Sequence, residues 1–294
     1  MRINFLNLAM QYNILPCTLI SSILRNGVIL LEEQIPTKSN KRNNYVPTTI
    51  SKVLAVLDCF SIHQPKLTAG DIGSQLGLTT STLYRYLSAM ENEGYLERDP
   101  ETGQYVIGLR VVELAGIALG HLEVRRHGQI ELDALAGNLK MNANLGVLYR
   151  GDTFHLCYSV QTEVDRMYTV IGRRTPAHCT AMGKVMLAYL PRDQAHQIVK
   201  STNFIKLSKH SVGTPEELDA ALDEVTQKAY AVDRGEVRES TWCVAAPVRE
   251  QGGRVVASIS VSSQRELVEP RIEEIAKEVR HYANKLSLRL GFFG

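Results

Sequence analysis

The stretch from Leu67 to Tyr105 constrains the fold of this chain more than any other part of its sequence. Apolar residues recur in its first half at the spacings by which two crossed helices pack together, namely at Ile72, Leu76, Leu78, Leu83 and Tyr86. Gly73 provides a small residue where the helices touch, and Gly77 can adopt the positive φ of a tight turn. Thr79 or Thr80 can cap the second helix by accepting its first free N–H groups. The pattern predicts a helix-turn-helix, whose second helix can enter a DNA major groove.

A short β-hairpin is predicted directly after these two helices. Residues 95–98 favour a strand, residues 99–103 contain the proline and glycine of a turn, and residues 104–107 favour the returning strand. Apolar spacing over residues 49–61 predicts one more helix in front. Together these elements make a winged helix. An ordinary helical pair inside a larger core is the alternative, and a hairpin at this distance disfavours it.

Three runs of the sequence resemble a known family. They are STLYRYLSAMENEGYLERDPETGQYVIG, GRRTPAHCTAMGKVMLAYL and CVAAPVREQGGRVVASISVS. Together they are similar to the IclR family of bacterial transcriptional regulators, and the resemblance extends from about residue 48 to the C-terminus. It implies a winged-helix DNA reader, a linker helix and a GAF/PAS-like effector-binding domain, assembled as dimers or dimers of dimers. The family often has Lys at the position of Thr80, so this chain lacks one expected phosphate contact.

We expect an α+β multidomain chain, because the second half alternates between strand and helix patterns. The expected parts are a flexible extension over residues 1–44, the winged helix-turn-helix over 45–108, the linker helix over 109–122 and the effector-binding domain over 123–294. Within the last part, strands of a largely antiparallel sheet are predicted at residues 145–149, 154–158, 166–171, 229–232, 242–249 and 254–262. Helices are predicted at residues 120–140, 180–190, 215–230 and 269–290, the third with Thr214 as its cap and Glu217 completing a capping box.

Composition limits the class of protein. A chain of 294 residues with 44% hydrophobic and 22% charged residues is typical of a globular protein with about two domains. Its five cysteines are odd in number and include no CxxC pair, which disfavours a zinc finger or a disulfide framework and favours reduced thiols in the cytoplasm. Residues 14–31 are largely apolar but interrupted. We expect no membrane partner; an added helix on the dimer and membrane association are the alternatives for the extension.

The charge of the winged helix does not by itself favour DNA. Residues 45–126 contain seven Lys and Arg against nine Asp and Glu, a net charge of −2, whereas DNA readers usually carry a basic surface. Lys38, Lys41 and Arg42 could supply part of that charge as an arm. The motif therefore carries the DNA prediction, and a winged-helix module that binds protein or RNA, joined to a sensor domain, stays open as the alternative.

The second helix of the motif has predicted inner and outer faces. Leu83, Leu87 and Met90 recur at core spacing, which leaves the predicted DNA-binding side chains outside: Thr80, Ser81, Thr82, Tyr84, Arg85 and Ser88. Arg85 is the only cation on this helix and can grip a phosphate or pair with a guanine edge. Its alternative role is a structural ion pair with Glu91 or Glu97.

In the second half the resemblance implies an effector site. The matching positions are Ala181, Met182, Asp233, Cys243, Ser260 and Ser262. A helix start after residue 180 favours an anion, and two serines two apart on a strand face one side, so we expect a small organic acid from a catabolic route. An ionised Asp233 would accept from a ligand hydroxyl, while Met182 and Trp242 would bound the ligand. Each feature also has a purely structural interpretation. The two serines could lie on a solvated strand face, Asp233 could cap a turn, and Cys243 could be a small core residue.

Catalysis and metal binding are weaker alternatives. His178 and Cys179 with Asp233 could form a nucleophile site, and His155, Cys157, His178 and Cys179 could be zinc ligands, but neither set has a recognisable spacing. The sequence has no phosphate-binding glycine loop. We therefore expect a non-enzymatic, DNA-binding homo-oligomer that needs neither cofactor nor metal.

Overall fold

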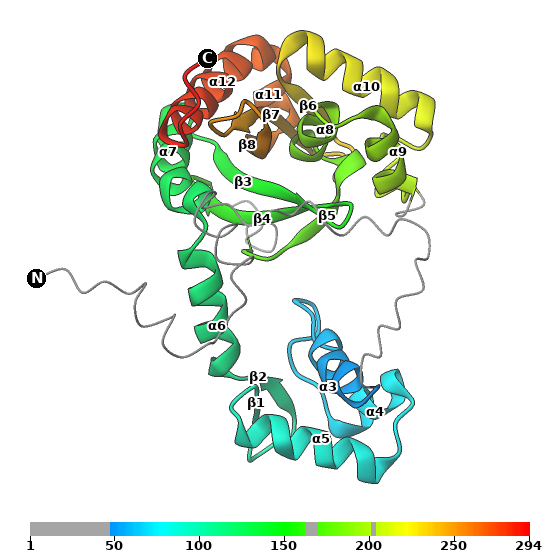
Figure 1. Cartoon of the computed structure of the whole chain (residues 1–294). Helices are drawn as coiled ribbons and strands as arrows, with labels where there is room; N and C mark the ends of the chain where they lie inside the picture. The colour runs from blue at the N-terminus through cyan, green and yellow to red at the C-terminus, as the bar shows by residue number, and fades with distance from the viewer. Residues whose placement is uncertain (1–47, 163–169, 201–203) are drawn as a thin grey trace, which may run out of the picture. The chain divides into compact units, whose positions relative to one another are not determined.

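The computed structural model describes residues 48–162, 170–200 and 204–294 (Figure 1). The expected extension with its basic arm, and four residues of the strand predicted at 166–171, lie outside these described residues. The chain divides into two compact units between His121 and Leu122. The first unit contains the described residues up to His121, and the second begins at Leu122.

The first unit is the predicted winged helix. Its elements are α3 (Thr48–Asp58), α4 (Ala69–Leu76), α5 (Thr80–Asn92), β1 (Leu96–Arg98), β2 (Tyr105–Ile107) and α6 (Leu109–Gly120). The two strands pair antiparallel across the predicted turn, and Leu67 bridges to Tyr105. One small core joins the elements, built on Val56, Leu67, Ile72, Leu87 and Leu96. The core contains the predicted positions Ile72, Leu83 and Leu87 and adds Leu67 and Leu96, and the fold class of the first half is confirmed.

The turn between α4 and α5 follows from its glycines. Gly77 ends α4 in the left-handed region at φ 60°, a conformation that a side chain would strain. A Cβ on Gly73 would lie 3.0 Å from Leu83 Cδ2, so the two helices touch where the small residue was expected. Thr68 and Asp71 form a reciprocal capping box that begins α4 and that was not predicted from the sequence.

The start of α5 differs from the expected cap. Thr79 occupies the N-cap position with extended backbone, but its side chain makes no cap hydrogen bond to the helix. Its Oγ1 lies instead 3.0 Å from Thr82 Oγ1. The expectation that Thr79 or Thr80 satisfies the first N–H groups of α5 is therefore wrong, because the hydroxyl of Thr82 competes for the same side chain.

The wing is fastened to α6. The Gly108 N–H donates to Tyr95 O at 2.8 Å, and a Cβ on Gly108 would lie 2.2 Å from Gly94 O, so only glycine fits there. Glu97 Oε1 accepts the Leu109 N–H at 3.2 Å at the start of α6. None of the side chains of α6 is buried within the described chain. The helix is thus held at its first residue and leaves an apolar surface exposed.

The second unit is built on one antiparallel sheet. Its described strands are β3 (Asn142–Tyr149), β4 (Asp152–Ser159), β5 (Arg174–Pro176), β6 (Ala231–Arg234), β7 (Thr241–Arg249) and β8 (Val255–Gln264), in the order β5-β4-β3-β8-β7-β6. The helices are α7 (Glu123–Leu139), α8 (Ala181–Ala188), α9 (Arg192–Lys200), α10 (Pro215–Lys228), α11 (Arg265–Val268) and α12 (Ile272–Arg289). Short 3-10 turns at Ala177–Cys179 and Glu269–Arg271 complete it. The predicted α+β class is confirmed.

The two faces of the sheet carry different helices (Figure 1). α7 and α12 pack on one face, where Leu145 meets Gly128 so closely that an added Cβ would lie 2.5 Å away. α8 packs on the other face against β6, β7, β8 and β3, with α10 outside it. A Cβ on Gly146 would lie 3.4 Å from Met182 Cε. Because neighbouring strand residues face opposite sides, Leu145 and Gly146 mark the two faces.

Several local expectations need correction. Of the strand predicted at 166–171, the described residues 170–171 are not in a strand, and Asp233 lies within β6 rather than after a strand. The predicted helix over 120–140 is interrupted at residues 121–122. The helix predicted at 269–290 begins as a 3-10 turn and continues as α12, and α11 precedes it as a short helix that was not predicted. Glu217 accepts from Gly213 N instead of completing the box at Thr214, although Thr214 does cap α10. No helix within the described ranges is long and apolar enough to cross a membrane.

Candidate functional sites

The exposed face of α5 carries the side chains predicted to contact DNA. Thr82 is partly exposed and the other five are exposed: Thr80, Ser81, Tyr84, Arg85 and Ser88. The opposite face buries Leu83, Leu87 and Met90, as the spacing predicts. The helix therefore presents hydroxyls, one aromatic ring and one cation to its surroundings.

Arg85 is available for an external partner. No ion pair or hydrogen bond of its side chain to Glu91 or Glu97 occurs in the described part of the chain, and Glu97 is engaged at the start of α6. Its guanidinium carbon lies 5.6 Å from the centroid of the Tyr86 ring. That contact does not neutralise the charge of the guanidinium.

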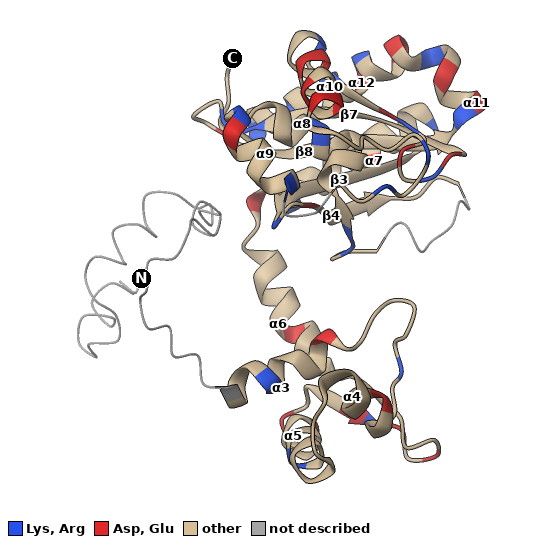
Figure 2. Ribbon diagram, turned by 90° about the vertical axis from the view of Figure 1, so that its right-hand side faces the viewer, with Lys and Arg blue, Asp and Glu red and all other residues tan. Residues whose placement is uncertain are grey.

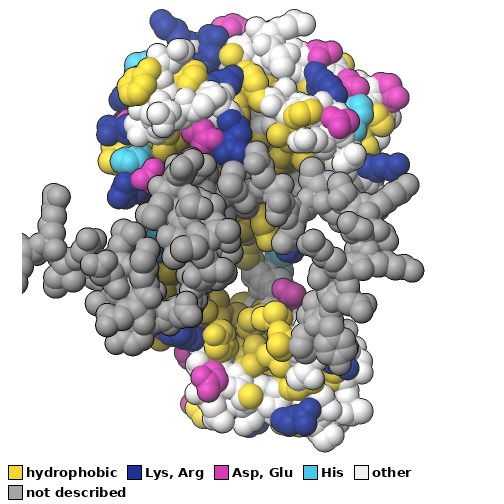
Figure 3. Space-filling view, in the orientation of Figure 1, with side chains coloured by type: hydrophobic (Ala, Val, Ile, Leu, Met, Phe, Trp, Pro, Cys, Tyr) yellow, Lys and Arg dark blue, Asp and Glu magenta, His cyan; other side chains and the backbone are white. Residues whose placement is uncertain are grey.

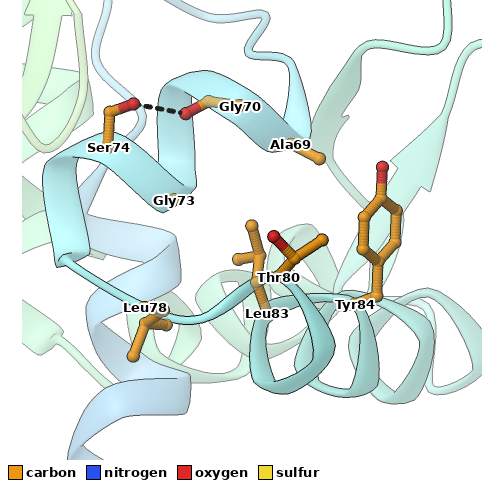
Figure 4. A pocket seen from close by; sticks show the side chains of 8 residues that line it. All are labelled: Ala69, Gly70, Gly73, Ser74, Leu78, Thr80, Leu83 and Tyr84. Atoms are coloured by element: carbon orange, nitrogen blue, oxygen red, sulfur yellow. Dashed lines mark hydrogen bonds between the residues drawn. The ribbon is translucent and has the colours of Figure 1, made fainter.

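A hollow of about 360 Å³ separates the start of α5 from α4 (Figure 4). Small residues of α4 form one wall, where the Ser74 hydroxyl donates to Gly70 O at 2.8 Å. Thr80 and Tyr84 stand on the other wall. The hollow therefore lies beside Thr80, the first residue of α5.

The first unit has no broad basic face in the part that the structure describes. Figure 2 shows acidic and basic residues interspersed over its helices. Lys66 lies 4.0 Å from Asp99, and Arg110 pairs with Glu113 at 2.6 Å. Cations that could attract a phosphate backbone are thus partly neutralised, and Arg85 stands out by its position on α5.

In the second unit, strand register brings distant residues into one row. Asp233 is paired with Cys243, Cys243 with Ser262, and Ser262 with Asn142, so the row crosses β6, β7, β8 and β3. Directly opposed residues of antiparallel strands share a face. Cys243 packs against the core cluster that contains Ala181 and Met182, which identifies this as the α8 face.

A second row lies beside the first on the same face. Ala245 is paired with Ser260 and Ser260 with Asn144, and Ala245 belongs to the α8 core cluster. Ser260 and Ser262 therefore face the same side, as their spacing predicts. The register and α8 gather all six predicted effector residues on one side of the sheet, and they add Asn142 and Asn144, which sequence reasoning missed. Alternation along β3 was the signal that could have found them.

The start of α8 faces this side with free donors. Thr180 Oγ1 accepts the Gly183 N–H at 2.9 Å, and Thr180 O accepts the Lys184 N–H. The N–H groups of Ala181 and Met182 have no hydrogen-bond partner among the described residues. A Cβ on Gly183 would lie 2.1 Å from Ala177 O, which explains why glycine is needed in the first turn.

Asp233 belongs to a buried charge cluster. It is 2% exposed, and its Oδ1 accepts the Glu236 N–H at 2.6 Å. The Lys184 ammonium contacts Glu236 Oε1 and donates to Val232 O at 2.8 Å. Burial, and then the charge of Glu236, raises the pKa of Asp233 to about 7. The expectation of a carboxylate fully ionised at neutral pH is therefore wrong.

Positive charge also reaches the α8 face. Burial, and then the charge of Arg173, lowers the pKa of His155 to about 4, so the imidazole is neutral at physiological pH. Arg173 also influences Cys243, although burial and Asp233 dominate and hold the pKa of that thiol well above its ordinary value. Arg173 is partly exposed, and its carbonyl accepts the His155 N–H at 3.0 Å.

Trp242 does not lie on this face. It is paired with Ser263 and Arg234 and alternates with Cys243, so it faces away from α8. Arg265 stacks on its ring at 5.4 Å from the centroid. The expectation that Trp242 bounds a ligand beside Met182 is wrong, since a strand position alone does not reveal its face.

The catalytic and zinc alternatives find little support. His178 Nε2 and Cys179 Sγ both contact Ile205 O, at 3.1 and 3.4 Å, and burial raises the pKa of Cys179 to about 11. A thiol held protonated is a poor nucleophile. Burial likewise raises the pKa of Cys157 to about 11. Within the described ranges no group of three or more His, Cys, Asp or Glu is arranged to hold a metal.

Comparison with known proteins matches both units. Residues 116–288 match the family model "Bacterial transcriptional regulator IclR C-terminal", and residues 49–100 match "IclR helix-turn-helix domain". The HTH-type transcriptional regulator KdgR of Dickeya chrysanthemi is 31% identical over 219 residues, covering 74% of this chain and 72% of that protein.

Solved structures share the fold. An IclR transcriptional regulator from Alicyclobacillus acidocaldarius is 24% identical with a TM-score of 0.73, covering 84% of this chain and 100% of that one. An IclR homologue from Microbacterium hydrocarbonoxydans, complexed with 4-hydroxybenzoate, is 24% identical with a TM-score of 0.72. That comparison covers 82% of this chain and 98% of the homologue.

Proposed function

The chain belongs to the IclR family of bacterial transcriptional regulators, and on that premise we propose that it controls a catabolic operon in response to a small organic acid. One observation carries the proposal: the chain combines an exposed helix-turn-helix surface with a buried polar face beneath α8. The activity is binding rather than catalysis. It takes place in the cytoplasm, where bacterial DNA lies.

The DNA-reading surface is α5. Its exposed hydroxyls and Arg85 can contact phosphates and base edges, and its uncapped first turn offers backbone N–H groups to a phosphate oxygen. Thr80, the first residue of that helix, lines the hollow between α4 and α5. These features support double-stranded DNA as the partner despite the sparse positive charge.

Assembly as at least a dimer is supported by exposed apolar side chains. On α6, Leu109, Val112 and Ile117 are 72%, 62% and 60% exposed, and on α3 Ile50 and Leu54 are 54% and 56% exposed. Figure 3 shows hydrophobic side chains gathered on the first unit near α3. A partner subunit that covers them would place two α5 helices on a palindromic operator.

The acid binds between the start of α8 and the polar rows of the sheet. The free N–H groups of Ala181 and Met182 receive its carboxylate, with Ser260 and Ser262 as further donors and Arg173 as nearby positive charge. Cys243 and Asp233 complete the wall, and Met182 provides apolar contact. The family member crystallised with 4-hydroxybenzoate carries an acid of this kind.

A winged-helix module that binds protein or RNA is the second candidate, favoured by the interspersed charges of the first unit. A gel shift with DNA from upstream of the gene, at two salt concentrations, separates the two. The regulator should bind that duplex specifically, more weakly at high salt, and change affinity when organic acids are added. Absence of a specific shift at either salt concentration would reject the DNA-reading function.

A further inference from the structure

Two buried side chains on the α8 face have polar atoms without partners. Asn144 is 7% exposed and His155 is 8% exposed. Asn144 Oδ1 and His155 Nδ1 are inaccessible to solvent, and neither accepts or donates a hydrogen bond within the structure described. Buried polar atoms are nearly always satisfied in folded proteins, and each exception costs stability.

The strand register places these two residues on neighbouring strands of the α8 face, on either side of Gly146. Asn144 is paired with Ser260 on β8, and His155 is paired with Gly146, two residues further along β3. Gly146 has no side chain, and a Cβ there would lie 3.1 Å from Phe154 O and Thr153 Cγ2 and 3.4 Å from Met182 Cε. Ser260, Asn144 and His155 therefore lie on three neighbouring strands of the α8 face, next to the position at which Met182 of α8 approaches the sheet.

Asn142 shows that a buried asparagine on this face of β3 need not lack hydrogen-bond partners. It lies on the same strand, two residues before Asn144, and is equally buried at 4% exposure. Its Oδ1 accepts the N–H groups of Gln161 and Thr162 at 2.8 and 3.1 Å. One asparagine thus holds a loop, while the other has its carbonyl aimed at the α8 side with nothing attached.

We propose that Asn144 and His155 together hold a hydroxyl group of the effector, so that this regulator recognises a hydroxylated carboxylic acid in preference to the same acid without the hydroxyl. The inference rests on the proposed effector function and adds a second polar contact to the carboxylate site. It identifies Asn144 and His155 as residues that determine ligand specificity.

One hydroxyl satisfies both atoms. It donates its hydrogen to Asn144 Oδ1, and one of its lone pairs accepts from His155 Nδ1–H. A neutral imidazole with its proton on Nδ1 is required, and burial together with Arg173 keeps the pKa of His155 at about 4, well below physiological pH. Asn144 Oδ1 and His155 Nδ1 are therefore hydrogen-bonded when the hydroxyl is present and lack a partner when it is absent.

The test is calorimetric titration of the full chain with matched acids: lactate and propionate, gluconate and hexanoate, 4-hydroxybenzoate and benzoate. In at least one pair the hydroxylated member should bind about tenfold or more tightly, because its absence leaves buried polar groups unpaired. Asn144→Leu and His155→Phe should each reduce that ratio to about threefold or less while the unhydroxylated acid binds as before.

Thermal unfolding without ligand provides the control for folding. Asn144→Leu should raise the melting temperature, because an unpartnered amide is replaced by an apolar side chain of similar size. Asn142→Leu, the matched change on the same strand, should lower it because two hydrogen bonds are lost. A structural role for Asn144 predicts that its variant is destabilised like that of Asn142.

The outcomes are distinct. Acids that bind equally well with and without the hydroxyl, or a preference that survives in both variants, overturn the inference while the carboxylate site stands. Destabilisation by Asn144→Leu also overturns it. If none of the six acids binds, the organic-acid function itself is rejected, and the inference with it.

Discussion

Replacing Arg85 by alanine tests whether α5 reads DNA. Arg85 is exposed, makes no ion pair in the described part of the chain, and is the only cation of α5. Its contact with the Tyr86 ring, at 5.6 Å, is of a kind worth about 0.5–1 kcal/mol when exposed. Folding should therefore change little, and any large effect must arise in the complex with DNA.

The expected loss follows from the contact that is removed. One specific arginine contact to DNA contributes about 1–3 kcal/mol. Each 1.4 kcal/mol is about tenfold in affinity, so the loss per subunit is about 5- to 150-fold. A dimer on a palindrome loses the contact twice, which doubles the free energy. If the contact is to phosphate, the slope of the logarithm of the binding constant against the logarithm of the salt concentration should also become shallower, by about 0.9 for each contact removed.

Gel shifts with the operator, at two salt concentrations, measure both effects. Arg85→Lys separates the two contacts, since lysine keeps a phosphate interaction but cannot make the paired hydrogen bonds of arginine to guanine. Lys52→Ala, which removes an exposed cation from α3, is the control for net charge. Binding by a folded Arg85→Ala protein within about twofold of wild type would refute the assignment, because even the lower limit is about fivefold.

Three further predictions concern assembly, ligand and pH. Light scattering at micromolar concentration should show at least a dimer, and Val112→Lys on α6 should shift the population toward monomer; a wild-type monomer contradicts the proposal. Replacing Ser260 and Ser262 together by alanine should remove most of the thermal stabilisation by an organic acid, which is about 2.7 kcal/mol at 100 times the dissociation constant; an unchanged response places the acid elsewhere. Because the pKa of Asp233 is raised from 3.8 to about 7, the folded chain holds this proton more tightly than the unfolded chain, so its contribution to stability falls as pH rises from about 4 to 7. Asp233→Asn should remove that part of the decline in melting temperature; equal slopes for variant and wild type would count against it.

The sequence was sufficient for the architecture of the first unit. Its elements are short and formed by residues close together in the sequence. Three local features predict them: the glycine at φ 60° in the turn, the apolar spacing of α5, and the proline and glycine between β1 and β2. The start of α5 was predicted less well. Thr79 has the right type and backbone for a cap, but its hydroxyl bonds Thr82, and local spacing does not decide between these partners.

In the second unit the positions of most strands could be predicted, whereas the side of the sheet that each side chain faces could be predicted less well. Ser260 and Ser262 could be assigned to one face because they are two apart, yet which face meets α8 depends on pairing with β7 and β3. For the same reason Trp242 was placed on the wrong side. Asn144 was missed because the predicted strand began one residue later, at Leu145, so the alternation along β3 was not followed back to it. Pairing between residues more than a hundred positions apart, such as Asn144 and Ser260, leaves no local trace in the sequence.

Side chains along each strand alternate between the two faces of the sheet. One face packs against α7 and α12 and stabilises the fold, and the other faces α8 and carries the polar groups proposed to bind the ligand. On β3, Leu145 packs against α7 while Asn144 and Gly146 face α8. Each unpartnered polar group on the α8 face costs about 1–3 kcal/mol. Full burial of one leucine contributes about 1.5–3 kcal/mol. The α7 and α12 face buries many apolar side chains, including Leu132, Leu135, Leu145, Ile259, Ile275 and Leu286. A few of them offset the two unmet polar groups, so this unit can keep a ligand-ready polar face and remain folded.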